Sequence, residues 1–225
     1  MKALFRLFIT VVLITGLIPT TGRAQNPFFP NKEGVILTYA NMDKKGKPTD
    51  YVRYTITKVA STDAQNFEVT YDTEALDKKQ EVLFKMPVEI QVKNGTVHFD
   101  PSSSMGKMME GVTITGEGTV VPANLEEGMT LDDSSVTVKM GSLTVVSSKI
   151  TETKVVAKEE LTTPAGTFEC YKVQSKVNGK AMGFRSENTV YTWYARNIGF
   201  VRTETYDKKN KLVSSGELIL MEEDN

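Results

Sequence analysis

The sequence has few of the residues on which most enzyme sites are built. Its 225 residues include one cysteine, Cys170, and one histidine, His98. A single cysteine cannot form an intramolecular disulfide, and a nucleophilic cysteine would need a base that only His98 could supply. Cys170 lies in the strand-like string "TFECYKV", so we expect a small buried side chain rather than a nucleophile.

Blocks of charge of one sign and common catalytic motifs are also missing. Basic and acidic residues are interspersed, with no basic stripe or tail, so the sequence predicts no nucleic-acid partner. There is no G-x-S-x-G nucleophile elbow and no calcium-loop pattern, and Gly116-Glu117-Gly118 lies in a strand pattern rather than before a helix. We therefore expect no catalytic residues, no metal site and no cofactor.

The first 24 residues have the features of a signal peptide. A basic start precedes the apolar string "LFITVVLITGLI" (7–18), and Gly22 and Ala24 are the small residues of a cleavage site. The alternative, a retained membrane anchor, fits less well because this run is too short to span a bilayer comfortably. The mature chain, 25–225, then has 24 basic and 28 acidic residues, a net charge of −4. We expect it to be exported, in the periplasm or secreted, with no stable membrane span.

Polar and apolar residues alternate along most of the mature chain, as they do in half-buried strands. The clearest strands are 51–59 and 67–74, and further strands are expected at 34–41, 111–121, 134–141, 143–160, 166–177 and 188–196. The segments 142–160 and 187–204 exceed the usual strand length. We expect them to bend over a curved sheet or to break at a bulge, as Gly199 would permit.

Two segments are predicted to be hairpins. "VEIQVKNGTVHFD" (88–100) turns at Asn94-Gly95, a strong type I′ signal, and "TETYDKKNKLVSSGELIL" (203–220) turns through Lys208–Asn210. "TYANMDKKGK", near the start, has a similar strand-into-lysine-turn pattern, but such tips recur without duplication. Together the strands predict one all-β domain over 25–225. Its fold is a strongly curved antiparallel sheet, or a partly open β-barrel or roll, with a short helical insertion near 102–110.

The hairpin turn sets the register around His98. Lys93 should pair with Thr96, Val92 with Val97, and Gln91 with His98. His98 then lies on the polar face, opposite the valines, where we expect it to face solvent rather than to take part in catalysis.

Three methionines follow this hairpin. Met105, Met108 and Met109 stand at i, i+3 and i+4, so a short helix would carry all three on one face. They could plug the mouth of the sheet, cover an apolar ligand as a lid, or bind Cu(I) as soft ligands. We take them as candidate ligand-binding residues and leave the three alternatives open.

The second half of the chain resembles a known family. The strings "TTPAGTFECYKVQSKV" (162–177) and "YTWYARNIGFVRTETYD" (191–207) are similar to the TapB-like, DUF3108-like family of exported Bacteroidetes proteins of unknown function. The resemblance covers about 28–220 and is best from Leu125 onward. It implies a curved antiparallel sheet, or a partly open barrel, and offers no catalytic residues.

These observations predict a non-enzymatic cell-envelope protein. Its concave face would bind an apolar, lipid-like or amphiphilic ligand, or an envelope protein partner. One alternative is an assembly protein that pairs through an exposed strand edge. A second is a hydrolase that uses two carboxylates facing each other across an aromatic pocket.

Overall fold

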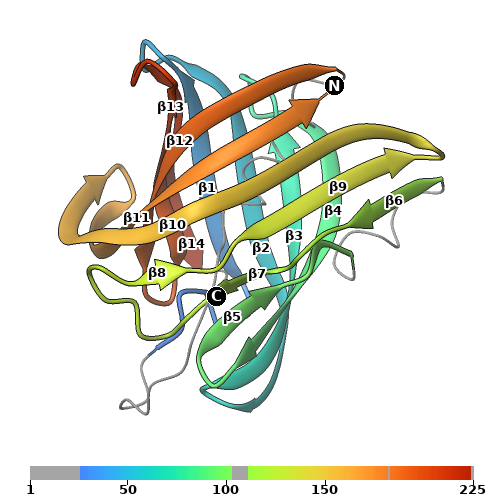
Figure 1. The fold of residues 1–225 in the computed structure, drawn as a ribbon. Helices are drawn as coiled ribbons and strands as arrows, with labels where there is room; N and C mark the ends of the chain where they lie inside the picture. Colours follow the sequence, from blue (N-terminus) through green and yellow to red (C-terminus); the bar gives the residue numbers. More distant parts are fainter. Residues whose placement is uncertain (1–25, 103–110, 182, 224–225) are drawn as a thin grey trace.

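The computed structural model describes residues 26–102, 111–181 and 183–223. They form one antiparallel sheet of 14 strands (Figure 1). Between the strands lie turns, bends and loops, apart from Pro101 and Ser102, which are helical. The strands are β1 (Val35–Asp43), β2 (Pro48–Asp63), β3 (Asn66–Leu76), β4 (Val82–Lys93), β5 (Thr96–Phe99), β6 (Val112–Thr115), β7 (Thr119–Val121), β8 (Thr130–Leu131), β9 (Ser134–Met140), β10 (Leu143–Thr163), β11 (Gly166–Ala181), β12 (Phe184–Ala195), β13 (Gly199–Asp207) and β14 (Leu212–Glu223).

Two runs of consecutive hairpins make up the sheet. One run is β9 to β14 and the other is β1 to β5, and the pairing of β14 with β1 joins them. β6 extends the sheet beside β9, β7 extends it beside β5, and the short β8 pairs with β10. Short turns between antiparallel neighbours account for most of this order.

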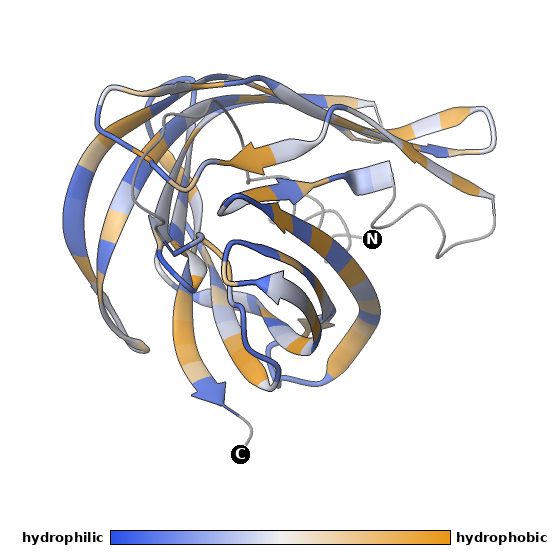
Figure 2. Ribbon diagram, turned by 90° about the horizontal axis from the view of Figure 1, so that it is seen from below, coloured by the Kyte–Doolittle hydropathy of each residue, from blue (hydrophilic) through white to orange (hydrophobic). Residues whose placement is uncertain are grey.

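The sheet bends almost round on itself without closing. β6 and β7 stand at opposite ends of the strand order, yet only residues 116–118 join them. Such a link spans at most about 14 Å, so the two ends of the sheet must come close (Figure 2). Gly116 makes the crossing possible, because a Cβ there would lie 1.9 Å from the Ser135 carbonyl oxygen. β6 and β7 do not pair, which leaves the described sheet open.

The core fills the concave side of the sheet. Along each strand apolar and polar residues alternate (Figure 2), and the apolar ones form rows across neighbouring strands. In one row Ile56, Tyr71 and Val88 stand side by side on β2, β3 and β4, all buried. The strands are amphipathic as predicted, so the apolar face of each strand borders the core.

Both predicted hairpins are confirmed. Gln91, Val92 and Lys93 pair with His98, Val97 and Thr96. Asn94 and Gly95 both have positive φ, 51° and 73°, as a type I′ turn requires. β13 and β14 form the second hairpin, and its turn runs through Lys208–Asn210.

Other expectations need correction. Residues 111–121 are two strands, β6 and β7, because the chain crosses between the sheet's edges at Gly116. Residues 187–204 reverse direction rather than bend: Asn197 (φ 60°) and Gly199 (φ 99°) turn β12 into β13. By contrast, 142–160 falls in β10 from Leu143 onward, and the register of β10 shifts between Thr151 and Lys154, as expected for a bent strand. The predicted helical insertion lies, apart from Ser102, outside the described residues.

Candidate functional site

Aromatic side chains gather on the concave face of β1, β2, β3 and β13. The rings of Tyr39 and Phe200 stack with centroids 4.4 Å apart. Tyr54 stands edge-on to both Tyr39 and Tyr71, with centroids 5.4 Å apart in each case. The Tyr39 hydroxyl donates a hydrogen bond of 2.8 Å to the Phe200 carbonyl, which ties β1 to β13. The strand pairing thus builds an apolar floor from residues distant in sequence.

The segment Asn26–Pro30 packs against this floor. Phe28 and Phe29 are only 2% and 9% exposed. The Phe28 ring stands edge-on to Tyr171 at 5.5 Å, and the Phe29 ring lies 5.5 Å from Tyr71. Two adjacent phenylalanines ahead of the first strand therefore fill space on the concave face that would otherwise be open.

The turn between β12 and β13 fastens this segment. The Arg196 guanidinium lies over the Phe28 ring, 4.6 Å from its centroid. One guanidinium nitrogen donates to the Asn26 carbonyl at 2.6 Å and to the Ala123 carbonyl at 2.9 Å. The Asn197 backbone N–H donates to the Pro27 carbonyl at 2.8 Å. Besides the packing of Phe28 and Phe29, the segment is held by these few hydrogen bonds and not by a strand ladder.

A small cavity remains between the segment and the floor. Its volume is about 30 Å³, room for about two water molecules. Phe28 and Phe29 form one side, and Tyr54 and Tyr71 are among the residues that form the other. Both tyrosines are buried, at 7% and 5% exposed. Burial raises the pKa of both phenols, so each remains a neutral hydrogen-bond donor. The cavity can therefore take an apolar group that carries an oxygen acceptor.

The residues predicted to bind a ligand fall in a part of the chain that the structure does not describe. Met105, Met108 and Met109 lie outside the described residues, so their role stays a prediction. Sequence reasoning missed Phe28 and Phe29. The string "NPFFP" was the available signal, because paired aromatics between prolines are unusual in a flexible terminus.

His98 and Cys170 do not take part in this site. His98 pairs with Gln91 on one side and Val120 on the other, and it is half-buried rather than fully exposed. Burial, with a smaller effect of Lys93, lowers its pKa. Cys170 is fully buried, as expected, and burial raises the pKa of its thiol to about 12.

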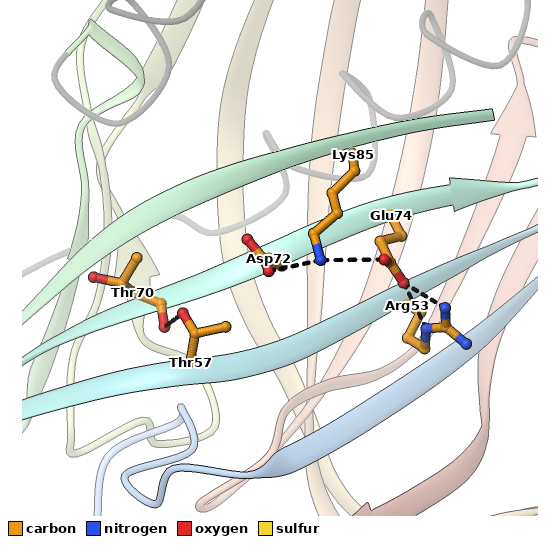
Figure 3. A network of polar contacts seen from close by, with 6 residues as sticks. All are labelled: Arg53, Thr57, Thr70, Asp72, Glu74 and Lys85. Carbon is orange, nitrogen blue, oxygen red and sulfur yellow. Dashed lines mark hydrogen bonds and ion pairs between the residues drawn. The ribbon is translucent and has the colours of Figure 1, made fainter. Parts of the chain in front are cut away.

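A pair of carboxylates lies on the opposite face of the sheet (Figure 3). The Lys85 ammonium is 2.9 Å from an Asp72 oxygen and 3.4 Å from a Glu74 oxygen. Arg53 binds the other Glu74 oxygen, with distances of 2.5 and 2.7 Å from two of its nitrogens. These carboxylates neutralise cations on the outside of β2, β3 and β4, and they do not face each other across the aromatic concavity. In the described ranges no three His, Cys, Asp or Glu residues gather to hold a metal ion.

Parts of the sheet edge are open to strand addition, among them residues 156–163 of β10, which lie beside β11 but have no strand on their other side among the described residues. β6 and β7, the two ends of the strand order, have four and three residues. On one side of β4, only Gln91–Lys93 pair with β5. Val82–Pro87 therefore have no neighbouring strand on that side of β4 among the described residues. Lys85 and Pro87 interrupt this open edge, and both residue types disfavour pairing with another strand.

Comparisons with known proteins agree with this architecture. The DUF3108-like family model matches residues 32–218, most of the chain. The chain belongs to the DUF3108-like family. No match was found among curated proteins. In the part of this DUF3108-like protein that the structure describes, no helix is long and apolar enough to span a membrane.

Two crystal structures share the DUF3108-like chain's fold. The first is a protein from Bacteroides fragilis, described as exported and as having a YmcC-like fold. It has a TM-score of 0.75 and 24% identity, and the match covers 88% of this chain and all of that one. The second is a protein from Parabacteroides distasonis, described as a lipoprotein. It has a TM-score of 0.74 and 26% identity, and the match covers 89% of this chain and all of that one.

Proposed function

We propose that this protein is a non-enzymatic module of the cell envelope that binds an apolar or amphiphilic ligand on its concave face. The cavity beneath Phe28 and Phe29 carries the proposal, because it is apolar and is lined by Tyr54 and Tyr71, whose buried phenols stay neutral. A ligand would place its apolar group among these rings and accept a hydrogen bond from Tyr54 or Tyr71.

The segment Asn26–Pro30 acts as a removable cover for this site. The present cavity holds about 30 Å³, far less than the ~300 Å³ and more of a drug-sized ligand pocket. A lipid-like guest enters only when Phe29, and with it Phe28, moves out. The contacts at Arg196 and Asn197 are few enough for such a release, whereas the strands below are fixed by their ladders.

A location in the cell envelope fits this role. The sequence begins with a predicted signal peptide, and the two proteins of like fold are described as exported and as a lipoprotein. The carboxylates of Figure 3 are ion-paired on the other face of the sheet, which favours binding over hydrolysis.

Titration with N-phenyl-1-naphthylamine, a neutral apolar dye that fluoresces on binding, tests the proposal. The mature protein should bind the dye weakly. Arg196→Ala, which releases the cover, and Phe29→Ala, which enlarges the cavity, should each tighten binding about tenfold or more, as removal of a competing internal occupant predicts. Circular dichroism confirms that each variant is folded.

Phe184→Ala is the matched control, because Phe184 is 82% exposed and far from the cavity in the strand pairing. It should bind the dye as the unmodified protein does. Equal affinity in all four proteins, or no binding in any of them, would contradict the proposed function.

A further inference from the structure

Three turns of the sheet share one short sequence pattern and one geometry. Residues 43–47, 77–81 and 207–211 read DKKGK, DKKQE and DKKNK, and they join β1 to β2, β3 to β4 and β13 to β14. In each turn the aspartate carboxylate accepts bonds from the backbone N–H groups two and four residues later. The fourth residue has positive φ in each: 71° at Gly46, 65° at Gln80 and 54° at Asn210. This is a type I turn followed by a left-handed residue, and it exposes two consecutive lysines at the tip.

The fold brings these turns to one rim. Strands β13, β14, β1, β2, β3 and β4 are neighbours in that order and all run antiparallel. Turns that follow every second strand of such a sheet lie at the same end. The connections from β9 to β10 and from β11 to β12 lie at this end of their strands as well (Figure 1), and we call these five hairpin ends the rim.

The rim is strongly basic although the protein is not. The five hairpin ends, 43–47, 77–81, 139–144, 180–185 and 207–211, contain eleven Lys and Arg residues and four Asp and Glu residues. Among the described residues only one of these eleven cations, Lys208, forms an ion pair, with Glu187 at 2.7 Å. The remaining charges are therefore available to an external anion. The sequence alone indicated interspersed charges, because the three lysine turns are far apart along the chain.

Apolar side chains project from the same rim. Six of the eight large apolar residues that are exposed among the described ones lie at these hairpin ends or within two residues of them: Val82, Leu83, Met140, Leu143, Phe184 and Val213. Phe184 is 82% exposed and Leu143 is 65% exposed. Phe184 pairs with Ala181, and Arg185 pairs with Lys180. The cations Arg185 and Lys180 therefore stand one residue, about 3.3 Å, behind Phe184 along the hairpin.

We propose that this rim docks the protein on a membrane surface rich in anionic lipids. Phe184, Leu143 and Met140 would enter the boundary between headgroups and acyl chains, while the lysine turns bind the phosphate layer. Charge and apolar exposure together favour this partner. A nucleic acid would satisfy the lysines but would gain nothing from projecting phenylalanine and leucine side chains. The inference does not depend on the concave binding site.

Sedimentation of the mature protein with vesicles tests the docking surface. Vesicles that contain phosphatidylglycerol and phosphatidylcholine should bind the protein, and vesicles of phosphatidylcholine alone should bind it far less. Lys44→Glu/Lys209→Glu should weaken binding at least about 25-fold, about fivefold for each lysine lost from an anionic surface. Lys58→Glu/Lys93→Glu, a matched pair of exposed lysines toward the opposite end of the sheet, should bind as the unmodified protein does.

The apolar part of the rim has its own variant. Leu143→Asp/Phe184→Asp should also lose most vesicle binding, while Leu220→Asp, at a 44% exposed site on β14, should not. A fluorescent nitrobenzoxadiazole label provides a second readout, because the buried Cys170 leaves an introduced cysteine as the reactive thiol. A label on Ser142→Cys, at the rim, should shift to the blue when vesicles are added, and a label on Ser61→Cys should not.

Three results would overturn the proposal: failure to bind the anionic vesicles, equal binding by the rim and control variants, or an unchanged label at residue 142. Binding of duplex DNA in place of vesicles at the same salt concentration would assign the rim to nucleic acid instead.

Discussion

Cys170 is the clearest case of a side chain whose chemistry is set by its surroundings. It is 0% exposed, and burial raises the pKa of its thiol to about 12, so almost no thiolate exists at neutral pH. We predict that 5,5′-dithiobis(2-nitrobenzoic acid) releases no thiolate dye from the native protein at pH 8. It should titrate one thiol per chain in denaturant. Rapid reaction of the native protein would contradict this burial.

Two of the aspartates that begin the lysine turns, Asp43 and Asp207, make stability depend on pH. Backbone N–H bonds, that from Lys211 foremost, lower the pKa of Asp207 in the folded state. A lowered folded pKa stabilises the fold fully above the unfolded pKa, about 3.9, and this stabilisation is lost as the pH falls through the folded pKa.

Asp207→Asn should therefore have a lower urea midpoint than the unmodified protein at pH 7. The gap should shrink steadily below about pH 4 as the native aspartate becomes protonated. Urea unfolding followed at several pH values measures it. A gap that stays constant down to pH 2 would mean that the turn gains nothing from the charge.

At the scale of elements, the crossing from β6 to β7 is the most sensitive connection. A Cβ on residue 116 would lie 1.9 Å from the Ser135 carbonyl oxygen and 2.9 Å from the Val136 Cα, both of which are backbone atoms. We predict that Gly116→Ala lowers the free energy of unfolding by about 3 kcal/mol or more, because a rigid overlap must be relieved. Chemical denaturation measures the loss.

Comparison of Gly116→Ala with Gly128→Ala distinguishes steric crowding from backbone strain. Gly128 has φ 90°, but a Cβ there would meet nothing within 4 Å. Its substitution should lower the free energy of unfolding by only about 1 kcal/mol, the usual cost when a residue with a Cβ adopts a left-handed conformation. Similar losses at both positions would show that crowding at Gly116 is not the dominant effect.

Elements defined by local chemistry could be predicted from the sequence. Asn94-Gly95 fixed both the turn and the register of its hairpin, because few residue pairs adopt two positive φ values. The reversal at 196–198 could not be predicted, because polar–apolar alternation continues through it and resembles one long strand. The pairings of β14 with β1 and of β6 with β9 are non-local, and no local pattern encodes them.

At the scale of the whole molecule, the site and the rim both arise from strand order. The aromatic floor unites Tyr39, Tyr54 and Tyr71, on the consecutive strands β1, β2 and β3, with Phe200 of β13, which the pairing of β14 with β1 brings beside them. An all-β fold with a concave face was predictable from periodicity, but its floor and its cover were not. The methionines drew attention because soft, flexible side chains suit ligands, whereas Phe28 and Phe29 lie outside any periodic element.

Native mass spectrometry of the mature protein, isolated from its own envelope fraction, tests the central claim most directly. The measurement is made before and after organic extraction, on the unmodified protein and on Phe29→Ala. A binding module for apolar ligands predicts a discrete adduct of lipid-like mass that extraction removes and that occupies a larger fraction of the Phe29→Ala protein. The bare mass of the polypeptide in every sample would contradict the account and leave the concave face as a closed core.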